Sequence, residues 1–217
     1  MSHVVVNHKT IASNISQFID FTDQEIMCVV KSDAYGHGLE NIVNTLYSQG
    51  IEFFSTYYLE EAIKIKEMLP SVNVLHMGPV FTVEELKLLS QLEIDLMVTS
   101  LELLRKINSD ADCYQKPLKV HIKLDTGLSR NGIHYSLFDD IKDELFTILE
   151  NINIDCVGIM SHLMMSNLES EETDAQIHRF EYACSQFIEE EINVRYFHLG
   201  NTSYLFHKGD KFSNLVR

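Results

Sequence analysis

The chain has 217 residues and a formal net charge of −15, since 32 Asp and Glu outnumber 17 Lys and Arg. This acidic balance argues against nucleic acid or an anionic membrane surface as the main partner. No apolar segment approaches the roughly 18 residues that a membrane helix needs, and the first ten residues lack the features of a signal peptide. We therefore expect a cytoplasmic protein with no membrane partner.

Cysteine and histidine show no metal-binding or disulfide pattern. The cysteines are far apart, without a C-x-x-C pair, and three of them lie in apolar segments, so we expect reduced structural thiols. They are Cys28, Cys113, Cys156 and Cys184. The ten histidines include no H-x-x-x-H pair beside a carboxylate or cysteine, and no metal site is predicted.

Apolar segments of strand length alternate with segments of helical periodicity along nearly the whole chain. The predicted strands are 25–31, 51–56, 72–78, 94–100, 118–125, 154–163 and 194–201. Helices are predicted at 39–49, 58–69, 101–108, 138–149 and 171–190, with one more opening at Thr82. Thr82 and Glu85 have the spacing of a capping box.

Seven successive β-then-α steps, with strands that are apolar on both faces, indicate a parallel sheet covered by helices. Such a sheet forms either a doubly wound open sheet or a (β/α)8 barrel of the TIM type. Because no G-x-G-x-x-G follows the first strand, we favour the barrel. The eighth strand begins only at the last residues, so we expect a barrel truncated at the start of strand 8, with two unpaired edges.

Polar residues gather at the carboxyl ends of the predicted strands, which share one mouth in a parallel barrel. They are Lys31, His76, Thr99, Lys123, Asp125, His162 and Asn201. Arg130 follows in the loop after the fifth strand and adds a third cation. This concentration of positive charge indicates an anionic ligand.

Lys31 ends an apolar strand and is followed at once by a loop that holds Tyr35, Gly36 and Gly38. A lysine in this position can simply snorkel to solvent. Alternatively, its amine lies in a cation-rich, poorly hydrated mouth and forms a Schiff base, with Tyr35 at a phosphate and the glycines allowing close backbone approach. The K-x-x-x-Y-G-x-G pattern by itself leaves both interpretations open.

Four segments in the same order resemble the alanine racemases, the fold-type III enzymes that carry pyridoxal 5′-phosphate (PLP). The segments are "VVKSDAYGHG" (29–38), "KLDTGLSRNGI" (123–133), "GIMSHL" (158–163), and "HLGNTS" (198–203) followed by "LVR" (215–217). The resemblance covers essentially the whole chain. It implies the N-terminal barrel domain of such an enzyme over residues 1–217, a C-terminal β domain that is absent here, and a homodimer for the full-length protein.

The same resemblance implies roles around the cofactor. Lys31 would form the Schiff base with PLP and carry a proton on one face of the substrate. Tyr35, Asn201 and Thr202 would form the phosphate site, with Thr202 in place of the family's usual serine. Either hydroxyl can donate a hydrogen bond.

It also implies a set of basic residues around the ring. Arg217 would face the pyridine nitrogen, and His162 would orient Arg217. Arg130 would contact the phenolic oxygen of the ring and the substrate carboxylate. Lys123 would be carbamylated, which turns a cation into an anion able to hold Arg130.

The implied reaction is interconversion of L- and D-alanine, which supplies D-alanine as a peptidoglycan precursor. The second base would be a tyrosine from the C-terminal domain of a partner subunit, so we expect weak or no racemisation by this chain alone. Alternatives are a non-catalytic PLP-binding homeostasis protein, a decarboxylase, a racemase of another amino acid such as serine, and a barrel without PLP. The A-Y-G-H-G after Lys31 and the D-T-G-x-x-R segment argue against the homeostasis protein.

Overall fold

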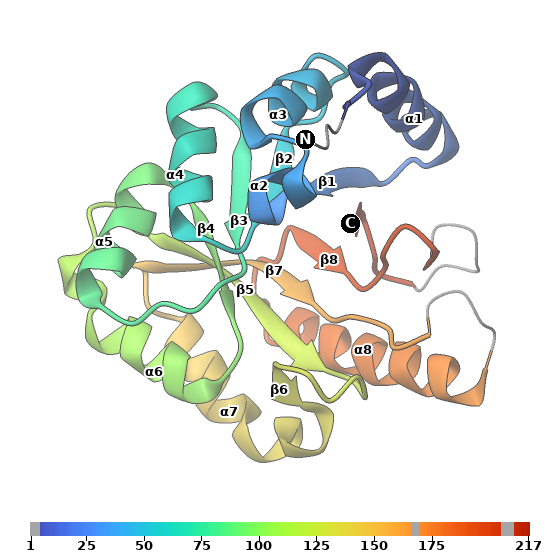
Figure 1. Cartoon of the computed structure of the whole chain (residues 1–217). Coiled ribbons are helices and arrows are strands. Elements are labelled where there is room, and N and C mark those ends of the chain that lie inside the picture. The colour runs from blue at the N-terminus through green and yellow to red at the C-terminus, as the bar shows by residue number, and fades with distance from the viewer. Residues whose placement is uncertain (1–4, 166–169, 205–210) are drawn as a thin grey trace.

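The computed structural model describes residues 5–165, 170–204 and 211–217, and these form a barrel of parallel strands surrounded by helices (Figure 1). In the described part the barrel strands follow the order β8-β7-β5-β4-β3-β2-β1-β9, and β6 pairs with β5 outside this order. Every barrel pair is parallel. The predicted (β/α)8 barrel is confirmed.

The strands lie within or next to the predicted apolar segments, with one short addition. They are β1 (Glu25–Val29), β2 (Phe53–Thr56), β3 (Asn73–His76), β4 (Asp95–Val98), β5 (Leu118–Asp125), β6 (Ile133–His134), β7 (Ile154–Met160), β8 (Tyr196–His198) and β9 (Leu215–Val216). No predicted element covers β6, whose two residues are too few for a periodic pattern.

The helices agree with the sequence pattern except at the N-terminus and directly after Lys31, where a loop is expected and a short helical turn is present. They are α1 (His8–Phe21), α2 (Lys31–Gly36), α3 (Leu39–Tyr47), α4 (Leu59–Met68), α5 (Val83–Leu92), α6 (Leu101–Ser109), α7 (Phe138–Leu149) and α8 (Glu171–Glu189), with the 3-10 turns η1 (Ala111–Cys113) and η2 (Tyr135–Leu137). The capping box at Thr82 and Glu85 is present.

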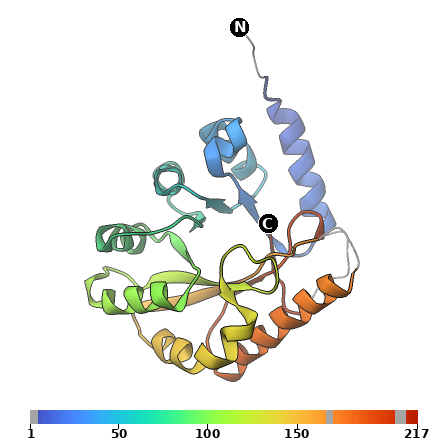
Figure 2. The same ribbon diagram turned by 60° about the horizontal axis from the view of Figure 1, so that its bottom comes forward.

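Helix α1 is covered by no predicted element. Ile11, Ile15 and Phe18 have the spacing of a helical face, but Ile15 is the helix's buried residue, so its apolar stripe is narrow. The helix packs beside α3, where His8 Nδ1 and Thr45 Oγ1 lie 2.9 Å apart (Figures 1 and 2). Tertiary contact with α3 therefore contributes to holding α1 in place.

Two apolar clusters lie on opposite faces of the sheet, because successive strand residues point to opposite sides. The larger cluster includes Phe54 and Leu96 and packs the strands against the helices. The smaller cluster fills the barrel interior and includes Met27, Phe53 and Met97. The interior is therefore a packed core, and the barrel can present a site only at its ends.

The gap between the first and last strands is narrower than the sequence suggests. Residues Leu215–Val216 already pair with β1, so β1 is not an open edge there. Asn214 reaches the other side: its N–H donates to Phe197 O at 3.0 Å, and its side-chain oxygen accepts from Phe197 N at 2.9 Å. The expectation of two unpaired edges is wrong at these residues, because one asparagine substitutes for part of a strand ladder.

Cys156 and Cys184 are buried, Cys28 is half-buried and Cys113 is exposed, in line with the apolar surroundings noted for most of these residues. Within the described ranges, no helix combines the length and hydropathy that crossing a bilayer requires.

We expect Gly158→Ala to destabilise the fold by about 1–3 kcal/mol, as overpacking does in well-packed interiors. Gly158 lies opposite His121 next to an irregularity in the β5–β7 register, and a Cβ built there would overlap the imidazole of His121. Urea denaturation measures the cost. In a His121→Ala background the cost should fall, and an unchanged cost would contradict this cause.

Candidate active site

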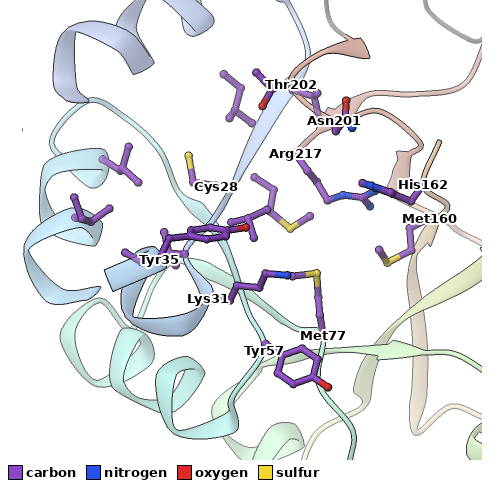
Figure 3. Close-up of a pocket in the computed structure, with 18 of the residues that line it drawn as sticks. Cys28, Lys31, Tyr35, Tyr57, Met77, Met160, His162, Asn201, Thr202 and Arg217 are labelled. Atoms are coloured by element: carbon purple, nitrogen blue, oxygen red, sulfur yellow. The ribbon is translucent and has the colours of Figure 1, made fainter. Parts of the chain in front are cut away.

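A cavity of about 960 Å³ opens at the carboxyl ends of the barrel strands. Figure 3 shows Lys31 extending across it, with Arg217 beside His162. The cavity is lined by all eight residues to which the sequence assigns a role: Lys31, Tyr35, Lys123, Arg130, His162, Asn201, Thr202 and Arg217. The strand-end residues His76, Thr99 and Asp125 are not among the described residues that line it.

The cavity is strongly cationic. Lys31, Lys123, Arg130 and Arg217 line it, and none of the described lining residues is an aspartate or glutamate. Met27, Met77, Met97 and Met160 supply apolar surface on the barrel side. The arrangement suits a flat ligand with anionic substituents, because the methionines can pack against a ring while the cations face charged groups.

The segment after Lys31 is a turn of left-handed helix. From Ser32 to Tyr35, four consecutive residues have φ between 52° and 57° and ψ between 34° and 55°. This conformation costs roughly 1–2 kcal/mol per L-residue. The Asp33 carboxylate stabilises the turn by accepting from Leu39 N at 2.7 Å, while Asp33 N donates to Glu61 Oε1 at 2.7 Å. The sequence predicts a loop here but not its handedness.

The loop that carries Arg130 is organised by Asp125. Its carboxylate accepts hydrogen bonds from the backbone N–H groups of Gly127 at 3.0 Å, Ser129 at 3.0 Å and Arg130 at 3.1 Å. Burial opposes the ionisation of Asp125, but these amides together with Lys123 outweigh it and lower the pKa of Asp125. The carboxylate is therefore occupied with the backbone and does not neutralise the cavity.

Arg217 is held by four acceptor atoms, one of which is the carbonyl oxygen of His198, 3.5 Å from Nη1. Its Nη2 donates to Ser161 O at 2.6 Å and lies 3.4 Å from His162 Nδ1, while its Nη1 lies 2.8 Å from His198 Nδ1. Burial, and then the charge of Arg130, lower the pKa of Arg217 to about 10, so the guanidinium stays charged at neutral pH. The contact with His162 agrees with the sequence interpretation. The shorter contact with His198 is one that sequence reasoning missed.

His162 is a neutral acceptor in this arrangement. Burial, followed by the charges of Arg217, Arg130 and Lys123, lowers its pKa to about 4. Because a guanidinium can only donate, Nδ1 of His162 must accept, and the ring proton lies on Nε2.

Lys123 is 2 % exposed, and its amine donates to Leu124 O at 2.8 Å. Burial lowers its pKa to about 7, Arg217 and Arg130 act in the same direction, and Asp125 opposes them. A substantial fraction of this amine is therefore uncharged near neutral pH, which is the form that reacts as a nucleophile.

Sequence reasoning also missed the contribution of α1 to the site. Ile11, Ile15 and Phe18 line an apolar extension of the cavity beside β1, together with Cys28. Their i, i+4, i+7 spacing was the available signal.

The structure is that of a parallel barrel with a basic cavity at its mouth. The mouth combines a strand-end lysine, a turn that carries a tyrosine, and an arginine in contact with two histidines, and this arrangement suits an anionic ligand. The family model for the alanine racemase N-terminal domain matches residues 6–217. The chain therefore belongs to the alanine racemase N-terminal domain family.

Individual relatives agree with this assignment. The chain is 31% identical to the alanine racemase of Geobacter sulfurreducens over 197 residues, covering 88% of this chain and 50% of that protein. It is 29% identical to the alanine racemase of Borreliella burgdorferi, and the match covers 97% of this chain and 59% of that protein. The chain thus spans about half the length of the curated relatives it matches.

Solved structures share the fold. The alanine racemase of Bacillus anthracis with bound L-Ala-P superposes with a TM-score of 0.86 at 24% identity, covering 98% of this chain and 55% of that one. The alanine racemase of Clostridium difficile in complex with cycloserine also superposes with a TM-score of 0.86, at 23% identity, and the match covers 96% of this chain and 57% of that one.

In CO2-depleted buffer, we expect the free energy of unfolding to rise between pH 7 and about 8, below the range in which the raised pKa values of the buried thiols of Cys28 and Cys156 oppose the rise. The pKa of Lys123 is about 7 in the folded chain, against 10.5 for an ordinary lysine, so the unfolded chain binds more protons in this window. The contribution of Lys123 to the free energy of unfolding is fully present above its pKa in the unfolded chain, and it is lost as the pH falls through about 7. Lys123→Met should flatten the dependence measured by urea denaturation. Lys119→Met, on the same strand, should leave this pH dependence unchanged. Equal slopes of the unfolding free energy against pH in both variants would contradict the assignment of the effect to Lys123.

Proposed function

We propose that this chain binds PLP through the amine of Lys31 and that the bound cofactor serves to move the α-proton of a small amino acid, alanine in the first instance. The observation that carries the proposal is the cavity itself, where three further basic residues and no described acidic side chain surround the strand-end Lys31. PLP and an amino acid together supply a phosphate, a phenolate and a carboxylate. Membership of the alanine racemase family supports the same assignment.

The residues present fit this cofactor. Tyr35, Asn201 and Thr202 line one cavity with Lys31 and carry hydroxyl or amide donors for a phosphate. Arg217 is held in place by acceptors on one side, which leaves its remaining N–H groups for the pyridine nitrogen. The methionines of the barrel interior offer a flat, polarizable surface to the ring.

When bound to an amino acid, PLP acidifies the α-proton by delocalising the electron pair left on the carbon. The amine of Lys31, set free when the amine of the substrate takes its place on the cofactor, would accept that proton on one face and return it. Arg130 holds the substrate carboxylate and orients the α-carbon toward Lys31. Arg217 remains charged and disfavours protonation of the ring nitrogen, because a second positive charge there would be repelled.

Carbamylation of Lys123 is part of the proposal. Its uncharged amine attacks the carbon of CO2 and loses one proton, so that the product carries one negative charge. The lowered pKa of Lys123 supports this step, since it raises the fraction of uncharged amine at neutral pH. The resulting anion would balance Arg130, to which the described lining residues offer no carboxylate.

We further propose that the opposite face of the α-carbon is served by a tyrosine from a partner subunit of a homodimer, as the family resemblance implies. Full interconversion of L- and D-alanine then requires both faces. The chain's coverage of about half of its relatives' length is compatible with this division of labour.

Lys31→Ala should abolish covalent PLP binding. Wild-type protein mixed with PLP should develop the visible absorption band of a lysine imine, because the side chain of Lys31 extends across the cavity. Titration followed by absorbance and by mass after borohydride reduction checks this. Lys87→Ala, on the exposed side of α5, controls for non-specific imines. Retention of the band in Lys31→Ala would sink the assignment.

Exchange of the α-proton of alanine with solvent should be faster than inversion of configuration at the α-carbon. In D2O with PLP, one enantiomer of alanine should lose its α-proton to solvent faster than it changes configuration, because Lys31 serves a single face. Proton NMR follows exchange, and chiral chromatography follows inversion. Lys31→Ala should stop the exchange. Equal rates of exchange and inversion for both enantiomers would show that this chain supplies both bases.

A further inference from the structure

A line of buried hydrogen bonds runs from Arg217 into the barrel interior. His198 Nδ1 lies 2.8 Å from Arg217 Nη1, His198 Nε2 lies 2.8 Å from His121 Nδ1, and His121 Nε2 lies 3.2 Å from Asp95 Oδ2. His121 and His198 are fully buried and Asp95 is 2 % exposed. The line therefore connects strands β4, β5 and β8 with the arginine that follows β9.

The chemistry of the donors fixes the direction of every bond. Arg217 can only donate, so His198 Nδ1 accepts and its proton lies on Nε2. That proton is donated to His121 Nδ1, and His121 in turn donates its Nε2 proton to Asp95. Burial and the charge of Arg217 lower the pKa of His198 well below its usual range, in agreement with a neutral ring. Both imidazoles thus share one tautomer, set by a cation at one end and a carboxylate at the other.

The surroundings hold the two rings in place. The imidazole of His121 stacks on Tyr196, with centroids 5.9 Å apart and an interplanar angle of 8°, and meets the edge of Phe53 at 6.1 Å. On the β7 side, the absence of a side chain at Gly158 makes room for the ring. Steric packing therefore restricts rotation of His121, and a change of tautomer is the cheaper response to losing a partner.

Asp95 is a costly residue to bury for structure alone. Among the residues that the structure describes, its Oδ1 has no hydrogen-bond partner. A buried carboxylate with one oxygen lacking a hydrogen-bond partner opposes folding unless its charge interacts favourably with another group. Arg195 and Lys66 interact with this carboxylate through space, while the charge that it reaches through the two hydrogen-bonded imidazoles is that of Arg217.

We propose that Asp95, His121 and His198 are positioning residues that fix the orientation of Arg217 and thereby its hydrogen bond to the pyridine nitrogen of PLP. This inference rests on the proposed function for the identity of the ligand. Without the carboxylate of Asp95, His121 and His198 can adopt the tautomer with the proton on Nδ1. The Nδ1–H of His198 then points at an N–H group of Arg217 and cannot accept its hydrogen bond. The guanidinium then loses one of its acceptors.

The first test needs no cofactor. Long-range ¹H–¹⁵N NMR of the PLP-free protein reports which ring nitrogen of each histidine carries the proton. We expect only the Nε2–H form of His121 and His198 in the wild type, and a mixture of both forms in Asp95→Asn, whose amide can accept or donate. Ser55→Ala is the matched control, since Ser55 is a fully buried barrel residue whose hydroxyl has no described partner. A single unchanged tautomer of His198 in Asp95→Asn overturns the proposal.

The second test measures the consequence at the ligand. We expect the dissociation constant for PLP to rise about tenfold in Asp95→Asn, the equivalent of one lost hydrogen bond to a charged group. Ser55→Ala should leave it unchanged. If Asp95→Asn does not fold by circular dichroism, His121→Phe, which keeps a ring against Tyr196, replaces it with the same expectations. Unchanged PLP affinity in a folded variant overturns the proposal.

The two hypotheses fail in different ways. If wild-type protein binds no PLP at Lys31, the proposed function fails, while the tautomers of the PLP-free protein still test the hydrogen-bond line. If PLP binds at Lys31 and the Asp95 variant matches the wild type in both measurements, only the positioning role fails.

Discussion

The dominant constraint on this molecule is an unbalanced group of positive charges held in one cavity. The chain as a whole carries a net charge of −15, yet four basic residues line the mouth of the barrel and no aspartate or glutamate is among the described lining residues. Burial with its poor hydration, followed by mutual repulsion, explains why the pKa values of Lys123, His162 and Arg217 are all lowered. A site built in this way is relieved by anions, which accounts for its fit to a phosphate and a carboxylate.

Holding these charges together requires stiff local structure. The left-handed turn at Ser32–Tyr35 brings the tyrosine back beside the cavity at a conformational cost, and hydrogen bonds to Asp33 stabilise it. Asp125 does comparable work for the loop of Arg130 through three backbone amides. In both places the carboxylate shapes the chain and leaves the cavity cationic.

Arg217 joins the site to the body of the barrel. It follows the strand that pairs with β1, and its guanidinium contacts groups from β8 and from the end of β7. The same region therefore closes the barrel and positions the guanidinium of Arg217 in the cavity. Stability and ligand geometry are coupled here, because displacing Arg217 disturbs the closure as well as the site.

Apolar periodicity and the ordered motifs were enough to predict the barrel and eight of the residues that line its mouth, since these signals depend on neighbouring positions in the chain. Helix α1, the handedness of the turn after Lys31 and the closure by Asn214 needed the tertiary structure. So did the contact between His121 and His198, which lie 77 residues apart in sequence. The physical reason is that a hydrogen bond between distant strands leaves no local pattern: each histidine alone resembles an ordinary strand residue, and only the folded barrel brings the two rings within reach of each other.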